Sequence, residues 1–420
     1  MFIINYFYFV IFNMNYDFII NDSRKPSFFS KNSFSNYLKK EIIKLFENNL
    51  ILSKHSESCF IGVEIHLSFY ENLLFEKLFL ISSLYVNIEY PDISNKLYKL
   101  FNKFNSLNCD KNFDHRNSQQ CRNIISNMIS VVCLAPKNNN FQLGVLSKLN
   151  TLDFELFMLK KNIKSESLEL TKDIFFQDDP KECILVLNEI AYLLRNNDDT
   201  TNKIFYWLSW LVEFEKKSKK EKIEIKLKEK VIDSISPKNS IFWEWNLWNI
   251  ILNEAKFRNN ELLYNQIFSL YNFYKFNFKK SSRNSYMNYI FHSIYLLKKN
   301  INFNINPLIK KIDLLNKSIL GNNFYYKTIF NKLDTKYFIE EDKIIKESLT
   351  NDVIKKDKNK TVKNNKNVEN NKNVENNKKD ESNKKDESNK TDVKVILTKK
   401  ELQEQKEKEI RERMQYLFIN

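Results

Sequence analysis

The shortage of glycine and proline is the feature that most restricts the fold of this 420-residue chain. It contains three glycines, Gly62, Gly144 and Gly321, and six prolines. Loops that cradle phosphates need several glycines close together, because the backbone must approach the ligand and adopt positive φ angles. A P-loop and a dinucleotide-binding fingerprint are therefore excluded. An all-β fold also needs more tight-turn residues, which favours helices joined by Asn-, Asp- and Ser-rich connections.

Apolar residues at spacings of three and four predict a succession of helices with short connectors. The expected helices cover residues 37–52, 64–86, 93–104, 121–134, 142–159, 180–194, 204–215, 241–252, 261–278 and 285–299, with shorter ones at 306–316, 322–333 and 340–349. They follow no fixed repeat period, which disfavours a regular helical-repeat array. We therefore predict an all-α protein, an irregular multi-helix bundle or solenoid-like array with a disordered C-terminal tail.

Composition divides the chain into four regions. Residues 1–35 combine an apolar run with a polar connector, and residues 36–350 are expected to form an α-helical globular domain with a possible subdivision near 196–201. Residues 351–397 contain the repeated hexapeptides NKNVEN and NKKDES, from which no core can be built, so this region is expected to be disordered. An amphipathic helix is predicted over 398–420.

The predicted C-terminal helix begins at a capping box formed by Thr398 and Glu401. A short helix at the end of a flexible tether is a plausible docking element, although a marginal surface helix with no partner fits equally well. The candidate docking residues are Leu402, Ile410, Met414 and Leu417.

The apolar run at residues 2–12 is shorter than the roughly 20 residues that span a bilayer. It also lacks the basic region and cleavage site of a signal peptide. The run is expected to pack on the body of the protein, unless Met14 is the initiator. A membrane anchor is the least favoured interpretation.

Every tryptophan lies in two apolar segments, IFYWLSWLVEFE (204–215) and IFWEWNLWNIIL (241–252). A charged run at 216–230 joins them, so the pattern predicts two helices that pack their tryptophans between them. Large aromatic residues at helical spacing are mostly buried. The alternative, a base-stacking platform, usually carries interleaved basic residues, which are missing here. The expected core residues are Trp207, Trp210, Trp243 and Trp248.

The same segments, FYWLSWLVEFEKK followed some thirty residues later by IFWEWNLWNIIL, resemble a pair found in conserved but uncharacterised proteins of giant cytoplasmic DNA viruses. The resemblance covers residues 60–300. It carries no activity and no site residues. It implies a viral origin and a location in the host cytoplasm, in a viral factory or the virion.

The net charge of +15 suits an acidic partner such as nucleic acid, but it is spread along the chain. The charged run holds Ile223, Ile225 and Leu227 in alternation, which predicts a short extended ribbon. A solvated charged hairpin is the structural interpretation of this run. The candidate phosphate contacts are Lys216, Lys217, Lys219, Lys220 and Lys222.

Five cysteines at no paired spacing indicate a reducing compartment. The best metal candidate is Cys109, His115 and Cys121, spaced C-x5-H-x5-C, but zinc sites commonly use a C-x2-4-C knuckle that this chain lacks. His55 and Cys59 form a thin Cys–His set, because a nucleophile pair needs proximity that spacing does not show. We expect no cofactor.

These patterns predict a non-enzymatic α-helical interaction or scaffold protein with a protein partner. No small-molecule substrate is expected, and membrane association is disfavoured. The alternative is a basic nucleic-acid-associated factor that contacts phosphates through Lys216 to Lys230.

Overall fold

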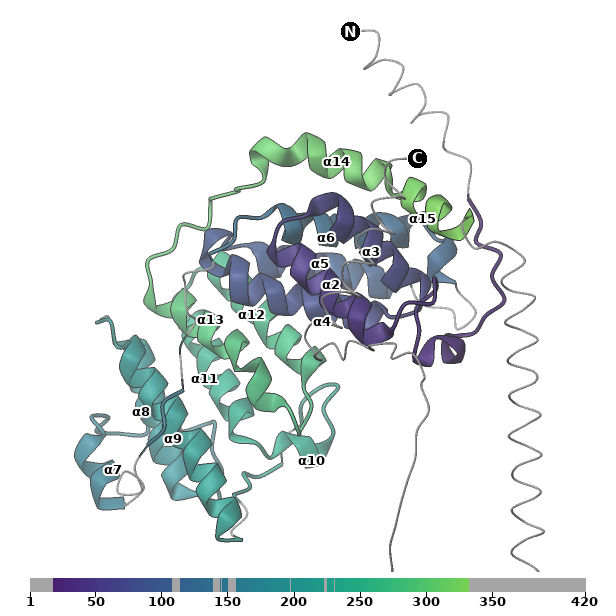
Figure 1. Ribbon diagram of the computed structural model, residues 1–420. Coiled ribbons are helices and arrows are strands. Elements are labelled where there is room, and N and C mark those ends of the chain that lie inside the picture. The colour runs from purple at the N-terminus through teal and green to yellow at the C-terminus, as the bar shows by residue number, and fades with distance from the viewer. Residues whose placement is uncertain are drawn as a thin grey trace, which may run out of the picture. The chain divides into compact units, whose positions relative to one another are not determined.

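The computed structural model describes residues 18–107, 114–138, 144, 146–149, 156–196, 198–222, 225–229 and 231–331. The chain divides into two units, Met1–Lys327 and Thr328–Asn420, and nearly all of the described residues belong to the first. Figure 1 shows this part as helices that follow one another with short connections.

The first unit is all-α, as predicted. Its longer helices are α2 (Lys39–Ile51), α3 (His55–Leu67), α4 (Glu71–Ile81), α5 (Ile93–Ser106), α6 (Gln119–Leu134), α8 (Lys181–Arg195), α9 (Thr201–Lys220), α11 (Trp243–Phe257), α12 (Glu261–Asn277) and α13 (Met287–Lys298). Shorter ones are α7 (Leu156–Asn162), α10 (Pro237–Ser240) and α14 (Ile312–Leu320), and α15 (Asn322–Asn331) runs across the unit boundary. Within the described ranges, β pairing is confined to two isolated bridges.

Two predicted helices are wrong. Over residues 142–159, Gly144 and residues 146–149 have no regular secondary structure, and the described helix is α7. The other is the helix predicted over residues 64–86. The chain instead forms α3 and α4, separated by a turn in which Phe69 takes a positive φ of 56°. The Ser68 hydroxyl bonds back to the Glu64 carbonyl at 2.6 Å, which helps to end α3. No glycine or proline marks this turn, so the sequence pattern runs through it unbroken.

The N-terminal helices pack around α6, which contacts α2, α3, α4 and α5. Gly62 lets α3 approach α6 closely, because a Cβ at this position would lie 2.2 Å from Cδ1 of Ile129. The polar segment predicted to be a connector also belongs to this body. Phe29 and Phe34 are buried, and the Tyr70 hydroxyl donates hydrogen bonds to the carbonyls of Phe29 and Asn32. The connector interpretation is therefore wrong for this segment, because its two aromatic rings drive it into the core.

A second group of helices, α8, α9, α11, α12 and α13, packs on the first through α12, which contacts α4 and α5. The seam is aromatic. Phe79 and Phe273 stack with ring centroids 3.8 Å apart, and Phe101 meets Phe276 edge to face. Aromatic pairs in these geometries add to the free energy gained by burial.

All five tryptophans are buried, but they do not form the expected hairpin. Helix α8 packs against both α9 and α11. Trp245 and Trp248 of α11 contact Tyr271 and Tyr274 of α12, whereas Trp210 of α9 stacks on Phe214 of its own helix. Helical spacing identified core positions here, but not the helix against which each one packs.

The unit boundary after Lys327 lies before the predicted domain end at residue 350, and the predicted subdivision near 196–201 falls within the first unit. The predictions for residues 1–17, 340–349, 351–397 and 398–420 lie outside the described residues. The candidate docking residues that fall there are Leu402, Ile410, Met414 and Leu417. Among the described helices, none is long and apolar enough to cross a membrane.

Candidate functional site

The lysine run does not form an extended ribbon at its start. Helix α9 continues to Lys220, so Lys217, Lys219 and Lys220 occupy its last turn, Lys216 lies just before it, and Lys222 follows the helix with a positive φ of 61°. Cations at a helix C-terminus are favoured by the helix dipole, which gives these lysines a structural role. Residues 225–229 have no regular secondary structure, and Ile223 lies outside the described residues.

Three of these five lysines are already paired with carboxylates. Lys216 lies 2.6 Å from Glu213, Lys219 lies 2.7 Å from Glu215, and Lys217 lies 4.0 Å from Glu221. Exposed pairs of this kind contribute little to stability, yet they reduce the positive charge offered to a polyanion.

Arg283 joins α9 to α11 through a buried ion network. Its guanidinium pairs with Glu215 of α9, and its Nη1 lies 3.4 Å from a carboxylate oxygen of Glu244 in α11. The indole nitrogen of Trp243 donates to Glu215 at 3.4 Å, and the guanidinium lies 4.1 Å from the centre of the Phe242 ring. A buried arginine that serves two carboxylates fixes the distance between the helices that carry them.

The two carboxylates of this network ionise differently. Burial opposes ionisation of Glu215, but hydrogen bonds and charge from Arg283 and Lys219 outweigh it and lower its pKa. Burial raises the pKa of Glu244 to about 7, which Arg283 only partly offsets. Near neutral pH the network therefore holds one firmly charged carboxylate and one that titrates.

The metal candidate falls partly outside the described residues, because Cys109 is not among them. The His115 ring lies tilted against that of Phe104 with centroids 5.1 Å apart, and Cys121 is buried in the first turn of α6. No group of three His, Cys, Asp or Glu residues that could hold a metal ion occurs among the described residues.

His55 and Cys59 do meet, together with two serines that the sequence did not indicate. Nε2 of His55 lies 2.9 Å from Oγ of Ser130, 3.0 Å from Oγ of Ser318 and 3.6 Å from Sγ of Cys59. Burial raises the pKa of Cys59 to about 12, so its thiol is a poor nucleophile at neutral pH. Ser130 is also fully buried. This cluster therefore links α3, α6 and α14 rather than offering a reactive group to solvent.

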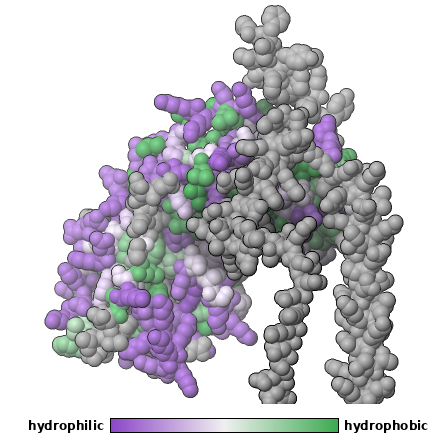
Figure 2. Space-filling view, viewed as in Figure 1, coloured by the Kyte–Doolittle hydropathy of each residue, from purple (hydrophilic) through white to green (hydrophobic). Residues whose placement is uncertain are grey.

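An exposed line of large apolar residues runs along α14 and its flanks. We call it the apolar ridge; it consists of Ile305, Ile309, Ile312, Leu320 and Phe324, each between 50% and 66% exposed. The opposite side of α14 packs on α6, with Leu315 buried and the Lys311 ammonium donating to the Leu134 carbonyl at 2.7 Å. Figure 1 shows α14 running along the outside of the N-terminal helices, and in Figure 2 apolar residues interrupt the hydrophilic surface there.

No known family, curated protein or solved structure matches this chain.

Proposed function

We propose that this protein is a non-enzymatic α-helical interaction protein and that the apolar ridge is its docking surface. The observation that carries the proposal is the exposure of five large apolar side chains in one line. Single exposed apolar residues are ordinary on protein surfaces, whereas contiguous groups of them mark interaction sites. Ile312 and Leu320 lie on α14, and Ile309 lies on the turn just before it, so the exposed apolar residues follow one another along this segment.

The charge beside the ridge supports a partner helix with acidic residues next to its apolar face. Lys317 lies on α14 and Lys310 on the turn Ile309–Lys311 just before it, and the described residues give neither of them an ion-pair partner. An amphipathic helix lays its apolar residues against such a surface, while opposite charges at the edge fix its direction.

The nucleic-acid alternative has less support. Of the five candidate phosphate contacts, Lys216, Lys217 and Lys219 each have a carboxylate partner, which leaves Lys220 and Lys222 without an ion pair among the described residues. Counterion release, which drives binding to the phosphate backbone, grows with the number of phosphates neutralised. The resemblance to proteins of giant cytoplasmic DNA viruses supports placing the interaction in the host cytoplasm.

Site-specific photocrosslinking in producing cells tests the ridge as a docking surface. A crosslinking amino acid replaces Ile309 or Leu320 in the full chain, and the same replacement at Leu52 serves as a matched control. Leu52 is also exposed, at 60%, but follows the C-terminus of α2 and is not part of the ridge. Both ridge positions are expected to capture the same protein, which the Leu52 variant does not capture.

Charge reversal then tests the predicted acidic edge of the partner. The double variant Lys310→Glu and Lys317→Glu is expected to weaken that crosslink severalfold while leaving the thermal transition unchanged. Identical crosslinks from Leu52 and from the ridge, or none from the ridge, would contradict the proposal.

A further inference from the structure

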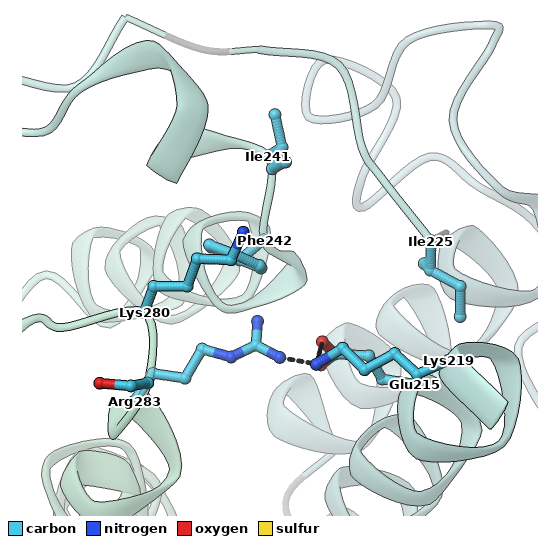
Figure 3. A pocket seen from close by; sticks show the side chains of 8 residues that line it. Glu215, Lys219, Ile225, Ile241, Phe242, Lys280 and Arg283 are labelled. Atoms are coloured by element: carbon cyan, nitrogen blue, oxygen red, sulfur yellow. Dashed lines mark ion pairs between the residues drawn. The ribbon is translucent and has the colours of Figure 1, made fainter. Parts of the chain in front are cut away.

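A cavity of about 560 Å³ lies beside the C-terminal end of α9, on elements that carry no part of the apolar ridge. Helix α9 contributes two of the lining residues. The others come from the loop after α9 and from the segments before α11 and α13 (Figure 3). Its lining residues are Glu215, Lys219, Ile225, Ile241, Phe242, Lys280, Ser281 and Arg283. The volume falls within the usual range for sites that hold small ligands, roughly 300–1,000 Å³.

The floor of the cavity is cationic, because three basic residues, Lys219, Lys280 and Arg283, line it together with one carboxylate, Glu215. Figure 3 shows Arg283 and Lys219 reaching toward Glu215 from opposite sides. Arg283 neutralises Glu215 in the buried network, so the charge of Lys219 is only partly consumed by its own pair with that carboxylate. Lys280 is exposed, lies 5.8 Å from the Phe242 ring centre, and has no ion pair within the described residues. The cavity therefore presents a net positive charge to a ligand.

The remaining wall is apolar and held in place. Ile225, Ile241 and Phe242 form it, and the Leu227 N–H donates to the Ile241 carbonyl at 3.0 Å, which ties the loop after α9 to the segment before α11. Phe242 is almost buried, with the Arg283 guanidinium on one face of its ring. A cavity lined by both cations and fixed apolar groups favours a ligand that carries an anionic group and an apolar body.

We propose that this cavity binds a phosphate monoester carrying a flat, weakly polar body, that is, a nucleotide. Lys219 and Lys280 contact the phosphate, Arg283 holds Glu215 away from it, and the base lies against Ile225, Ile241 and Phe242. Ammonium groups bind phosphate as point charges, and a positive cavity also draws anions from solution. Such a ligand arrives either as a free mononucleotide or as the 5′-phosphorylated end of an oligonucleotide.

Isothermal titration of the full chain tests this assignment with adenosine monophosphate, adenosine and inorganic phosphate at one ionic strength. Adenosine monophosphate is expected to bind at least tenfold more tightly than either of the others, because it alone carries both a phosphate for the basic residues and a base for the apolar residues. Trp243 emission provides a second readout, since its indole contacts Glu215. The proposal is overturned if adenosine binds as tightly as its monophosphate or if none of the three binds.

Two neighbouring lysines provide the matched variants. Lys280→Ala removes a cation that lines the cavity, and adenosine monophosphate is expected to bind at least fivefold more weakly. Lys279→Ala removes an equally exposed cation that pairs with Glu76 at 3.4 Å outside the cavity, and binding is expected to remain unchanged. Equal affinities for the two variants would overturn the proposal.

An oligonucleotide with and without a 5′-phosphate distinguishes the two sources of the ligand. If the phosphorylated form binds more tightly than adenosine monophosphate and the Lys280→Ala variant loses this binding, the ligand is a nucleic-acid end. If the mononucleotide binds more tightly, the ligand is free in solution. Either result supports nucleotide binding in the cavity. Failure of the ridge crosslinks would not affect this conclusion, because the cavity and the apolar ridge lie on different elements.

Discussion

Two buried carboxylate sites in the same helical unit are stabilised in different ways. In the N-terminal group of helices, Glu64 of α3 accepts hydrogen bonds from the Ser33 hydroxyl and from the N–H and hydroxyl of Ser35, at 2.6 to 2.7 Å. In the second group, Glu215 and Glu244 share the guanidinium of Arg283. The first site ties the N-terminal segment to α3, and the second ties α9 to α11.

The groups around a buried carboxyl determine the direction in which its pKa shifts. Burial raises the pKa of Glu64, and the serine hydrogen bonds and the charge of Arg24 offset this only in part. Arg283 and Lys219 reverse the effect of burial at Glu215, so its pKa falls. At Glu64 the effect of burial on the pKa therefore dominates, whereas at Glu215 the hydrogen bonds and charges of two cations overcome it.

Removal of Arg283 is expected to have the largest effect, because it leaves the buried Glu244 without its cation and Glu215 with only Lys219. Arg283→Met should lower the free energy of unfolding by about 3–5 kcal/mol, measured by urea denaturation. Lys279→Met is the matched control, since it breaks the exposed pair with Glu76 and should cost no more than about 1 kcal/mol.

A triple variant separates the loss of the cation from the loss of packing. With Glu215→Gln and Glu244→Gln added to Arg283→Met, no buried charge is left unpaired, so most of the lost stability should return. If the triple variant is as unstable as Arg283→Met, unpaired charge does not account for the lost stability. The proposed difference between this site and that of Glu64 would then be wrong.

The pH dependence of stability provides the second prediction. The folded-state pKa of Glu244, about 7, lies above its unfolded value near 4.5. Its contribution to stability is therefore complete below pH 4.5 and is lost as pH rises through 7. Around it lie Arg283, Glu215, Lys219 and Tyr274, and Arg283 remains charged across this window.

Denaturation curves measured between pH 5 and pH 8 provide the test. Glu244→Gln should reduce the decline in stability across that window by no more than roughly 3 kcal/mol. Glu71, whose pKa burial also raises to about 7, keeps part of the decline in place. Glu215→Gln should leave this window unchanged and should instead remove a loss of stability below pH 4.5, because the lowered pKa of Glu215 adds stability that is lost only on acidification. If the two variants changed the pH dependence of stability in the same way, the proposed difference between Glu215 and Glu244 would be wrong.

The smallest effect is expected at the serine-bound site. Ser35→Ala removes one donor to Glu64 and leaves the backbone N–H and the Ser33 hydroxyl in place, so the loss should be about 1 kcal/mol. Ser106→Ala, at an exposed hydroxyl bonded to the Lys103 carbonyl, provides the comparison and should change stability by less than half of that. A loss from Ser35→Ala as large as that from Arg283→Met would reverse the ranking of the two sites.

Local pattern predicted much of the fold. The helices near 93–104, 121–134, 180–194 and 261–278 match α5, α6, α8 and α12 within a few residues, because each carries an apolar stripe that ends at a polar connector. The pattern did not predict the break between α3 and α4, where Phe69 rather than a glycine takes the positive φ. It also missed the burial of Phe29 and Phe34 in a serine-rich segment.

The candidate sites were harder to predict because they are assembled from distant parts of the chain. Lys219 was identified from its charge, but Lys280 and Arg283 lie more than fifty residues away and carry no motif. Ser130 and Ser318 reach His55 from two other helices, and the apolar ridge looks in sequence like any amphipathic helix.

The sequence by itself determined the helical class, the buried tryptophans and the absence of a glycine-built phosphate loop, since spacing and composition act locally. Tertiary structure alone decided that α8 would pack against both tryptophan helices, that Arg283 would join Glu215 to Glu244, and that one face of α14 would stay exposed. These outcomes depend on which surfaces pack together, because a helix with two apolar faces can bury either face against any of several neighbouring helices.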